Sequence, residues 1–459
     1  MIEKSVKFLV EDFGPFRKAE LKLRPLTLIV GRNTVGKSML IYLLWSFIGS
    51  LPDFDHLFEY ADKHGATELA KEILELVKRG KAPKDQLLKL LRLHIEGLAQ
   101  AFAISLSKTF EKVFGTSLVN LIRKGSNSSR IMIEGEKFTL ECMLRSSGID
   151  ARFSEIDMEF LDNLEIEVLK PGYLRTVESK SGKILVEESI GSIRDVASIV
   201  ISHLGSYARR TLIPLLVGDE IATLLVDSRA GITKTLLKPY LDPSVAKALL
   251  YPEEHYIRLY YRLSEELAKG GIKLSIIEPL LSELGVKVES VLERGVFRIY
   301  LVTWTGHRVP FELAPSGIRE SLVLSLALAT ENNPRIIFIE EPEAHLHPRA
   351  QKMLAKLIVR SVNRLGKSVV LTTHSDYILF TLSNMVALSR APEKVTELGY
   401  DSSEVLDPRI ISAYLVKQVG DVAELVELEV TSEGIDEESF AEVARELADE
   451  KAEILASKH

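Results

Sequence analysis

Eight consecutive residues near the start of the chain have the types and the spacing of a phosphate-binding loop. Residues 31–38 read Gly-Arg-Asn-Thr-Val-Gly-Lys-Ser and match the pattern G-x-x-x-x-G-K-[ST] in full. In such a loop, backbone amides converge on phosphate oxygens, and the following helix adds positive potential at its N-terminus. Three residues are therefore expected to bind a nucleotide through the loop: Gly31, Asn33 and Gly36. Lys37 is expected to reach the β- and γ-phosphates, and Ser38 to ligate Mg²⁺.

Two adjacent carboxylates far downstream could supply the second half of such a site. Glu340 and Glu341 directly follow four apolar residues, 336–339, which is typical of a strand buried on both faces of a parallel sheet. Ligands of open α/β sheets bind at the carboxyl ends of such strands. We therefore expect Glu340 to hold Mg²⁺, through water, and Glu341 to orient and polarise the attacking water. The alternative, two exposed acids that end a strand, loses weight because the same chain carries the phosphate loop.

Two further segments, one on each side of the acid pair in the sequence, could also contribute to a nucleotide site. Ser316 and Gly317 precede a helical pattern upstream of the acids. Ser316 is expected to be the N-cap and Gly317 to allow a close backbone approach, so that the helix start binds an anion. A plain helix cap is the alternative. His374 follows a second buried strand and is expected to donate a hydrogen bond to the γ-phosphate, although a lone histidine after a strand is usually structural.

Three other residues leave their alternatives open. His345 and His347 stand two residues apart without a third ligand nearby, which is poor for zinc. We expect their loop to contact a second subunit across the nucleotide. Arg229, within Asp-Ser-Arg-Ala-Gly, could brace the nucleotide-facing lobe, contact a partner, or be an ordinary surface arginine.

Composition narrows the class of protein. The chain has 459 residues, of which 46% are hydrophobic, so it can bury one or two cores. Its one cysteine, Cys142, excludes an intrachain disulfide and points to a reducing compartment. The net charge of −7 provides no general basic field for nucleic acid.

The longest apolar run, 40–51, is shorter than the about 20 residues that a membrane helix needs, and the start lacks a secretion pattern. We therefore expect a soluble cytoplasmic protein without a membrane partner.

Hydrophobic periodicity predicts the elements that must position these residues. It divides the chain into five parts: an N-terminal lobe with the phosphate loop (1–51), a helical insertion (52–127), a β-rich part (128–190), a helical lobe (191–290) and a C-terminal lobe (291–459). The β-rich part is expected to include a strand at 158–160. The C-terminal lobe is expected to hold a hairpin at 296–313, helices at 316–330 and 348–365, buried strands at 335–339 and 368–372, and, after 411, one more strand and an acidic helix.

Taken in order, these motifs resemble the RecF/OLD-like branch of the ABC/SMC-head P-loop ATPases. The resemblance spans nearly the whole chain and rests on seven segments: 13–16, 31–38, 229–231, 315–317, 340–348, 373–375 and 411–434. It implies an α/β fold, an ABC-ATPase head with a mixed sheet, a helical insertion and a helical lobe. It also implies that Ser316 belongs to a signature that caps the γ-phosphate of the opposite subunit. The chain shows neither the acid clusters of a Toprim nuclease domain nor a long coiled coil, so the resemblance implies a stand-alone ATPase head.

Three hypotheses follow for function. The first is an ATPase that needs ATP and Mg²⁺, acts as an ATP-driven dimerisation switch, in a homodimer or a higher oligomer, and works with a separate effector in anti-phage defence or DNA maintenance. The second is a clamp that binds DNA ends only in the ATP-bound dimer. The third is an ATP-bound scaffold of negligible turnover that holds a toxin or a nuclease.

Overall fold

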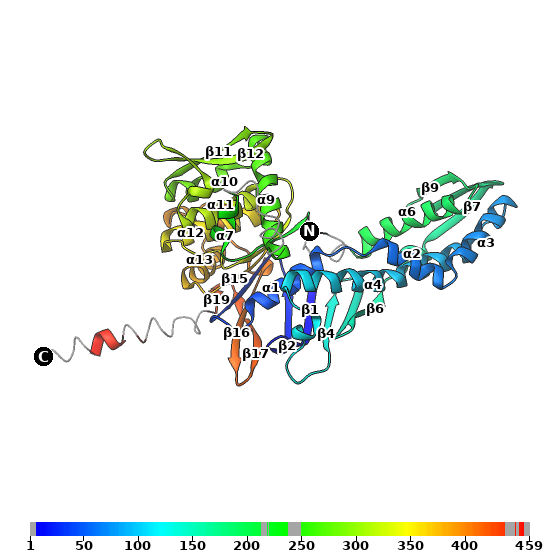
Figure 1. Cartoon of the computed structure of the whole chain (residues 1–459), viewed down its shortest axis with the longest axis horizontal. Helices are drawn as coiled ribbons and strands as arrows, with labels where there is room; N and C mark the ends of the chain where they lie inside the picture. The colour runs from blue at the N-terminus through cyan, green and yellow to red at the C-terminus, as the bar shows by residue number, and fades with distance from the viewer. Residues whose placement is uncertain are drawn as a thin grey trace. The chain divides into compact units, whose positions relative to one another are not determined.

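A computed structural model describes residues 6–212, 218, 220–236, 249–436, 446 and 449–453 (Figure 1). The chain forms two compact units. We call the first the core unit; it comprises residues 1–5, 15–45 and 220–459. We call the second the insert unit; it comprises residues 6–14 and 46–219. Among the described residues, no helix has both the length and the apolar character needed to cross a bilayer.

The core unit is built around seven neighbouring strands. Their order is β10 (Ala222–Leu225), β14 (Ile336–Glu340), β15 (Ser368–Thr373), β3 (Leu26–Gly31), β16 (Ile411–Val419), β17 (Val422–Leu428) and β2 (Phe16–Leu23). The first five run parallel to one another, and β16 and β17 form an antiparallel hairpin. Every residue of β3, β14 and β15 is buried, as their mainly apolar sequences predict. Because these strands are parallel, their carboxyl ends lie along one edge of the sheet.

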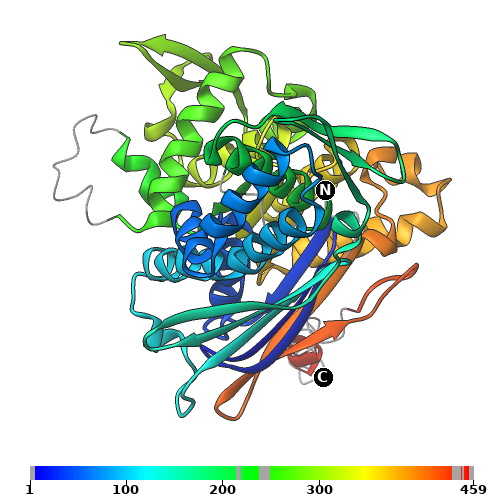
Figure 2. The same ribbon diagram turned by 90° about the vertical axis from the view of Figure 1, so that its right-hand side faces the viewer.

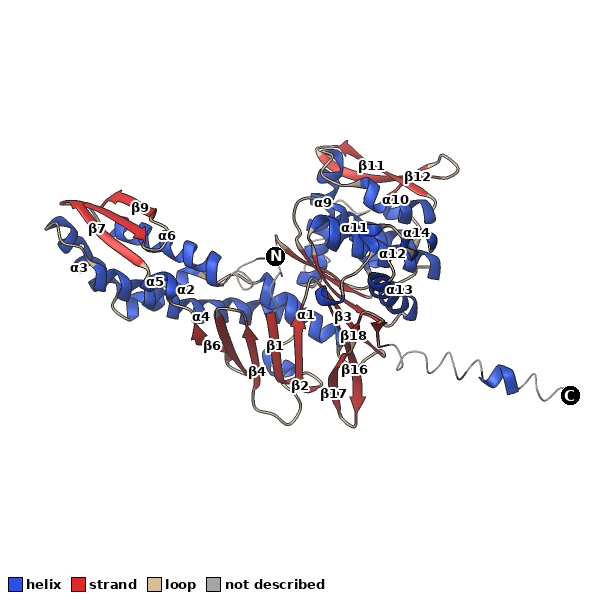
Figure 3. Ribbon diagram, turned by 180° about the vertical axis from the view of Figure 1, so that it is seen from behind, coloured by secondary structure: helices blue, strands red, loops and turns tan. Residues whose placement is uncertain are grey.

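Helices cover this sheet and connect its strands. Helix α1 (Lys37–Gly49) follows β3, α11 (Ser316–Ala329) packs on β14, and α12 (Pro348–Leu365) packs on β15 and on α13 (Asp376–Ala387) (Figure 3). Helices α7 (Arg229–Thr235), α9 (Tyr251–Ala268) and α10 (Leu274–Glu283) pack near α11. A smaller antiparallel sheet joins β11 (Val286–Glu293), β12 (Val296–Thr303) and β13 (Arg308–Pro310) at one end of the unit (Figure 2).

The insert unit combines four antiparallel strands with helices. The strands are β1 (Val6–Phe13), β4 (Ser129–Glu134), β5 (Phe138–Arg145) and β6 (Gly148–Ile156), and the long helix α4 (Lys84–Phe114) lies against them (Figure 1). Helices α2 (Phe54–Lys63), α3 (Ala66–Lys78) and α6 (Ile193–Thr211) pack on α4. A second sheet contains β7 (Leu164–Lys170), β8 (Tyr173–Glu178) and β9 (Lys183–Ser189). The five-part division of the chain stays a prediction.

Several expected elements were wrong. Residues 159–162 form a short helix, α5 (Glu159–Asp162), where we predicted a strand, because the Asp157 carboxylate accepts the Glu159 amide at 2.7 Å and starts a helical turn. Strands β10 and β11 lie largely within the segment expected to be helical; a segment as short as the four residues of β10 cannot be assigned from periodicity alone. The C-terminal segment holds not one strand but β16, β17, β18 (Val430–Thr431) and β19 (Gly434–Ile435). The predicted acidic helix lies mostly outside the described residues.

Candidate nucleotide site

The predicted phosphate loop connects β3 to α1 in a strongly curved backbone. Three of its residues have a positive φ: Gly31 (150°), Thr34 (65°) and Gly36 (106°). A Cβ atom on Gly31 would lie 2.4 Å from the Val416 carbonyl oxygen, and one on Gly36 would lie 2.6 Å from Pro15 Cγ. Both positions therefore require glycine. Helix α1 begins at Lys37, so its free amides and positive dipole end face the loop.

The Lys37 side chain folds back onto the backbone of its own loop. Its side chain is buried, and Nζ donates to the carbonyl oxygens of Gly31, at 2.9 Å, and Arg32, at 2.8 Å. Burial lowers the pKa of Lys37, while the negative charges of Glu341, Glu343 and Glu340 act in the opposite direction. The ammonium group therefore lies within the electrostatic reach of three carboxylates that are far downstream in the sequence.

A hydrogen bond ties α1 directly to Glu340. The Tyr42 hydroxyl donates to Glu340 Oε2 at 2.9 Å, and the Asp227 amide donates to the same oxygen at 3.2 Å. Burial and the nearby Glu340 carboxylate raise the pKa of Tyr42, which keeps the phenol protonated as a donor. Ser38 lies four residues before Tyr42 and so occupies the same face of α1.

The donor set fits a magnesium ion that is bound mainly by phosphate and water oxygens. Mg²⁺ prefers hard oxygen ligands, keeps several waters, and needs only one or two protein groups. Ser38 and Glu340 could provide these groups. Among the described residues, no three His, Cys, Asp or Glu side chains form a cluster that could hold a metal ion. Two buried oxygens nearby, Thr372 Oγ1 and Glu343 Oε2, accept or donate no hydrogen bond, which is unusual unless water or a ligand completes the site.

Glu341 occupies an unusual backbone conformation at the end of β14. Its φ is +43°, in the left-handed region that a residue with a side chain seldom adopts. Its amide donates to the Thr372 carbonyl at 3.0 Å, and its side chain is partly exposed. Such strain, of order 1–3 kcal/mol, persists where the surrounding contacts over-determine the position.

His374 lies beside Glu341 and is held by a residue to which sequence reasoning gave no role. His374 Nδ1 is 3.4 Å from Glu341 Oε1. Glu343 is buried, and its Oε1 accepts both the His374 amide, at 2.9 Å, and the Thr373 hydroxyl, at 2.7 Å. Glu343 therefore positions the segment that carries His374. The signal available in the sequence was an acid two residues after the carboxylate pair, but its burial could not be inferred.

Ser316 does not cap its helix as predicted. Pro315 takes the N-cap position, and Ser316 is the first helical residue, without a side-chain capping hydrogen bond. Proline, with φ of −52° and ψ of 151°, already supplies the extended backbone that precedes a helix. Gly317 does permit a close approach, but to the same chain, because a Cβ there would lie 2.7 Å from the His345 carbonyl oxygen. The start of α11 thus touches the loop that follows Glu341.

The two histidines of that loop have local backbone roles. His347 is the N-cap of α12, and its Nδ1 accepts the Arg349 amide at 3.4 Å. His345 has a positive φ of 58°. The expected contact of this loop with a second subunit stays a prediction, because the structure contains one chain.

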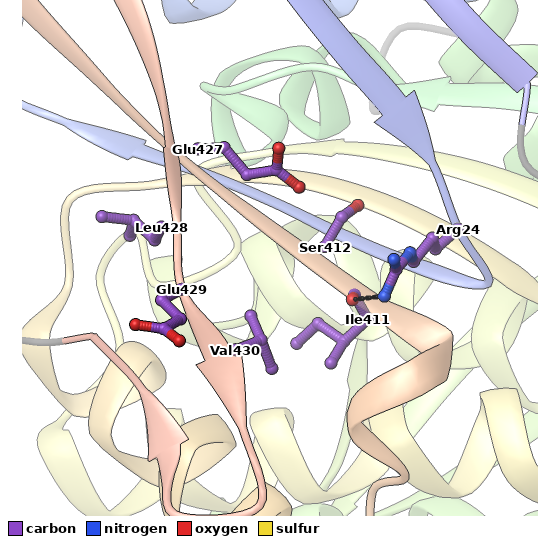
Figure 4. Close-up of a pocket in the computed structure, with 7 residues that line it drawn as sticks. All are labelled: Arg24, Ile411, Ser412, Glu427, Leu428, Glu429 and Val430. Carbon is purple, nitrogen blue, oxygen red and sulfur yellow. Dashed lines mark hydrogen bonds between the residues drawn. The ribbon is translucent and has the colours of Figure 1, made fainter.

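A separate pocket of about 330 Å³ lies at the opposite edge of the sheet (Figure 4). It is lined by Arg24, by residues of β16, β17 and β18, and by Glu429, and β16 begins there beside the amino end of β3. The Arg24 guanidinium already donates to the carbonyl oxygens of Ile411, at 2.9 Å, and Pro408, at 3.3 Å. This pocket is not part of the candidate nucleotide site, which lies at the carboxyl ends of the strands.

The parallel strands, the phosphate loop at the end of β3 and the acid pair at the end of β14 define an α/β P-loop fold. A family model described as an AAA ATPase domain matches residues 233–379. The methionine import ATP-binding protein MetN of Bacillus subtilis is 28% identical over 234 residues, which are 51% of this chain and 64% of MetN. This chain therefore spans slightly less than two thirds of the length of that relative.

Two other comparisons have lower identity. The energy-coupling factor transporter ATP-binding protein EcfA2 of Enterococcus faecalis is 21% identical over 256 residues, which are 54% of this chain and 81% of EcfA2. A crystal structure of an Smc head bound to the C-winged helix domain of ScpA aligns with a TM-score of 0.45 and 12% identity, over 92% of this chain and 97% of that chain. The site and the sequence matches together support a P-loop ATPase of the ABC type.

Proposed function

We propose that the protein is an ATP-driven dimerisation switch, in which two copies close across ATP and Mg²⁺ and hydrolysis opens them again. The observation that carries the proposal is that the phosphate loop with Lys37 and the acids at the end of β14 belong to one site. Lys37 is within the electrostatic reach of Glu340 and Glu341, and the Tyr42 hydroxyl, one turn further along α1, donates to Glu340 at 2.9 Å.

Each side chain then has a defined task. Lys37 exchanges its two loop carbonyls for β- and γ-phosphate oxygens, which are better partners for an ammonium group. Ser38 and Glu340 would hold Mg²⁺, which would neutralise phosphate charge. The amides of the loop around Gly31, Asn33 and Gly36 bind the remaining phosphate oxygens.

Glu341 and His374 act on the reacting atoms. Glu341 is partly exposed and can accept a hydrogen bond from water, which orients and polarises that water for attack on the γ-phosphorus. His374 donates to a γ-phosphate oxygen, with its segment held by Glu343. Phosphoryl transfer needs mainly positioning and charge stabilisation, and these residues supply both.

The dimer and its partners extend this proposal. Ser316 and Gly317, at the start of α11, would cap the γ-phosphate bound by a second copy. The resemblance to the RecF/OLD-like branch extends the proposal to a separate effector protein in anti-phage defence or DNA maintenance. The support for this step is the resemblance in residues 340–348 and 315–317.

Glu341→Gln tests the proposal. The variant should bind ATP and Mg²⁺, hydrolyse it at least about 100-fold more slowly, and elute as a dimer that dissociates when nucleotide is removed. Lys37→Ala should bind no nucleotide and remain monomeric under the same conditions. A Glu341→Gln variant that turns over ATP at the wild-type rate would remove Glu341 from the mechanism, and one that stays monomeric with ATP bound would remove the dimer.

The same samples separate the other two hypotheses. A DNA clamp requires binding of DNA ends that appears only with ATP and weakens as salt rises. A scaffold requires slow wild-type turnover together with a stable higher oligomer. The net charge of −7 gives the DNA clamp no independent support.

A further inference from the structure

Arg229 has a completely buried charge and a complete set of partners. It is the first residue of α7, and none of its side-chain surface is exposed. A buried guanidinium is tolerated only when its charge and its N–H groups are paired. The ion-pair partner is Glu320 of α11, whose Oε2 lies 3.3 Å from Arg229 Nε. The alternative of an ordinary surface arginine is therefore wrong.

The guanidinium of Arg229 also holds the backbone of both acids in the nucleotide site. Nη1 donates to the Glu340 carbonyl at 2.7 Å, and Nη2 donates to the Glu341 carbonyl at 3.0 Å. On the other side, the Glu341 amide donates to Thr372. These bonds fix the peptide groups on each side of Glu341 and explain how a non-glycine residue is kept at a φ of +43°.

The opposite end of this arrangement reaches the start of α11. Glu320, also buried, accepts the Ala230 amide at 2.9 Å through Oε1. The neighbouring Arg319 donates to the Ala230 carbonyl, and its Nε donates to the Ala314 carbonyl at 2.8 Å. Ala314 lies two residues before Ser316. Hydrogen bonds therefore run without interruption from the start of α11, through α7, to the peptide groups of Glu341.

We propose that Arg229 is a positioning residue for ATP hydrolysis: it holds Glu341 in the conformation needed to act on water and ties that conformation to the start of α11. This inference rests on the proposed function. As a consequence, a shift of α11 moves the Glu340 and Glu341 carbonyls, to which Arg229 donates. Such a shift would occur when Ser316 binds a nucleotide held by a second copy. A displacement of about 1 Å at a reacting group can change a rate by on the order of 100-fold.

Two substitutions separate positioning from simple stabilisation. Arg229→Lys keeps the positive charge beside Glu320, but one ammonium cannot reproduce the planar fork that reaches two carbonyls. Glu320→Gln removes the ion pair but leaves the contacts of Arg229 with Glu340 and Glu341. A positioning role predicts that Arg229→Lys lowers kcat about tenfold or more, with the Kd for ATP and Mg²⁺ unchanged. It also predicts that Glu320→Gln lowers the melting temperature and leaves kcat near the wild-type value.

Arg360 provides a matched control in the same unit. It pairs with the fully buried Glu404 and donates to the Ile276 carbonyl at 3.3 Å, and it touches neither acid of the site. Arg360→Lys should change the melting temperature as Arg229→Lys does and leave kcat as in the wild type. If Arg229→Lys does not fold, the neutral pair Arg229→Met with Glu320→Gln removes both charges and should show the same loss of kcat.

The outcomes distinguish this inference from the proposed function. Wild-type protein that hydrolyses no ATP overturns both. Active wild-type protein with an Arg229→Lys variant of equal kcat overturns only the positioning role. A loss of kcat that is accompanied by an equal weakening of ATP binding, or that is matched by Arg360→Lys, also overturns it, because a merely structural arginine would have that effect.

Discussion

His374 Nδ1 lies 3.4 Å from Oε1 of Glu341, and the amide of the same histidine is bonded to Glu343. The imidazole therefore belongs to a group that includes the proposed base, although 31 to 33 residues separate them in the sequence. Groups that act together on a single transition state lose activity in a non-additive way when they are removed together. This relationship makes the proposed roles testable as a pair.

Glu341→Gln and His374→Ala should each lower kcat, and the double variant should lose little more than Glu341→Gln alone. The single losses are expected to be of order 100-fold for Glu341 and about tenfold for His374. Steady-state ATPase rates at saturating ATP give the double-mutant cycle. His307→Ala is the control, because that histidine is exposed in the turn between β12 and β13. Fully additive losses would mean that the two residues act independently.

Tyr42→Phe should lower the affinity for Mg²⁺ without lowering the stability of the protein. It removes the hydroxyl that donates to Glu340 Oε2 and leaves the Asp227 amide as the remaining donor described for that oxygen. Loss of such a supporting contact typically costs about 10-fold or more in metal affinity. The Mg²⁺ concentration that gives half-maximal ATPase activity should rise by about that factor.

Tyr377→Phe, at an exposed tyrosine of α13, supplies the control for that measurement. It should keep the wild-type Mg²⁺ dependence. A Tyr42→Phe variant with the same dependence would mean that the bond to Glu340 does not support the metal.

Much of the fold and of the proposed site could be predicted because the signals are local. The loop 31–38 is a contiguous pattern, and the runs 336–339 and 369–371 are apolar without interruption. Parallel pairing then places the end of β14 beside that of β15, and the end of β15 beside that of β3. The residue roles assigned from these patterns stay predictions.

The remaining features depend on contacts between segments far apart in the sequence. No motif assigns Tyr42 or Arg229 to Glu340. Tyr42 donates to the Glu340 carboxylate from about 300 residues away in the sequence, and Arg229 donates to the Glu340 carbonyl from about 110 residues away. Strand β10 has four residues, and only its pairing with β14 selects a strand over a helix. The cap at Pro315 was missed because a serine one residue later has the higher capping propensity.

Glu343→Ala should cost both stability and activity, and Glu343→Gln should cost much less of either. Alanine leaves the Thr373 hydroxyl and the His374 amide without their buried acceptor, at a cost of about 1–3 kcal/mol. Glutamine keeps an amide oxygen of similar position. Denaturant unfolding and ATPase rates measure the two effects. Equal losses in both variants would show that the negative charge of Glu343, rather than its acceptor geometry, matters.

Lys367 should make the free energy of unfolding depend on pH. It is buried at the start of β15, where Nζ donates to the Pro334 carbonyl at 2.6 Å. Burial, with the charges of Arg335 and Arg262, lowers its pKa to about 7. An unfolded lysine has a pKa of about 10.4. Between these values the unfolded chain binds more protons than the folded one, so stability rises with pH from about 7 upwards.

The Lys367→Met variant isolates this contribution. The wild-type free energy of unfolding should carry an added slope of up to about 1.4 kcal/mol per pH unit between pH 7 and 9, and the variant should lack it. The absolute stability of the variant is not the readout, because methionine also leaves the carbonyls of Asn332 and Pro334 without their donor. Urea unfolding at several pH values gives the slope for each protein. Parallel slopes would show that the Lys367 amine stays protonated in the folded protein throughout this range.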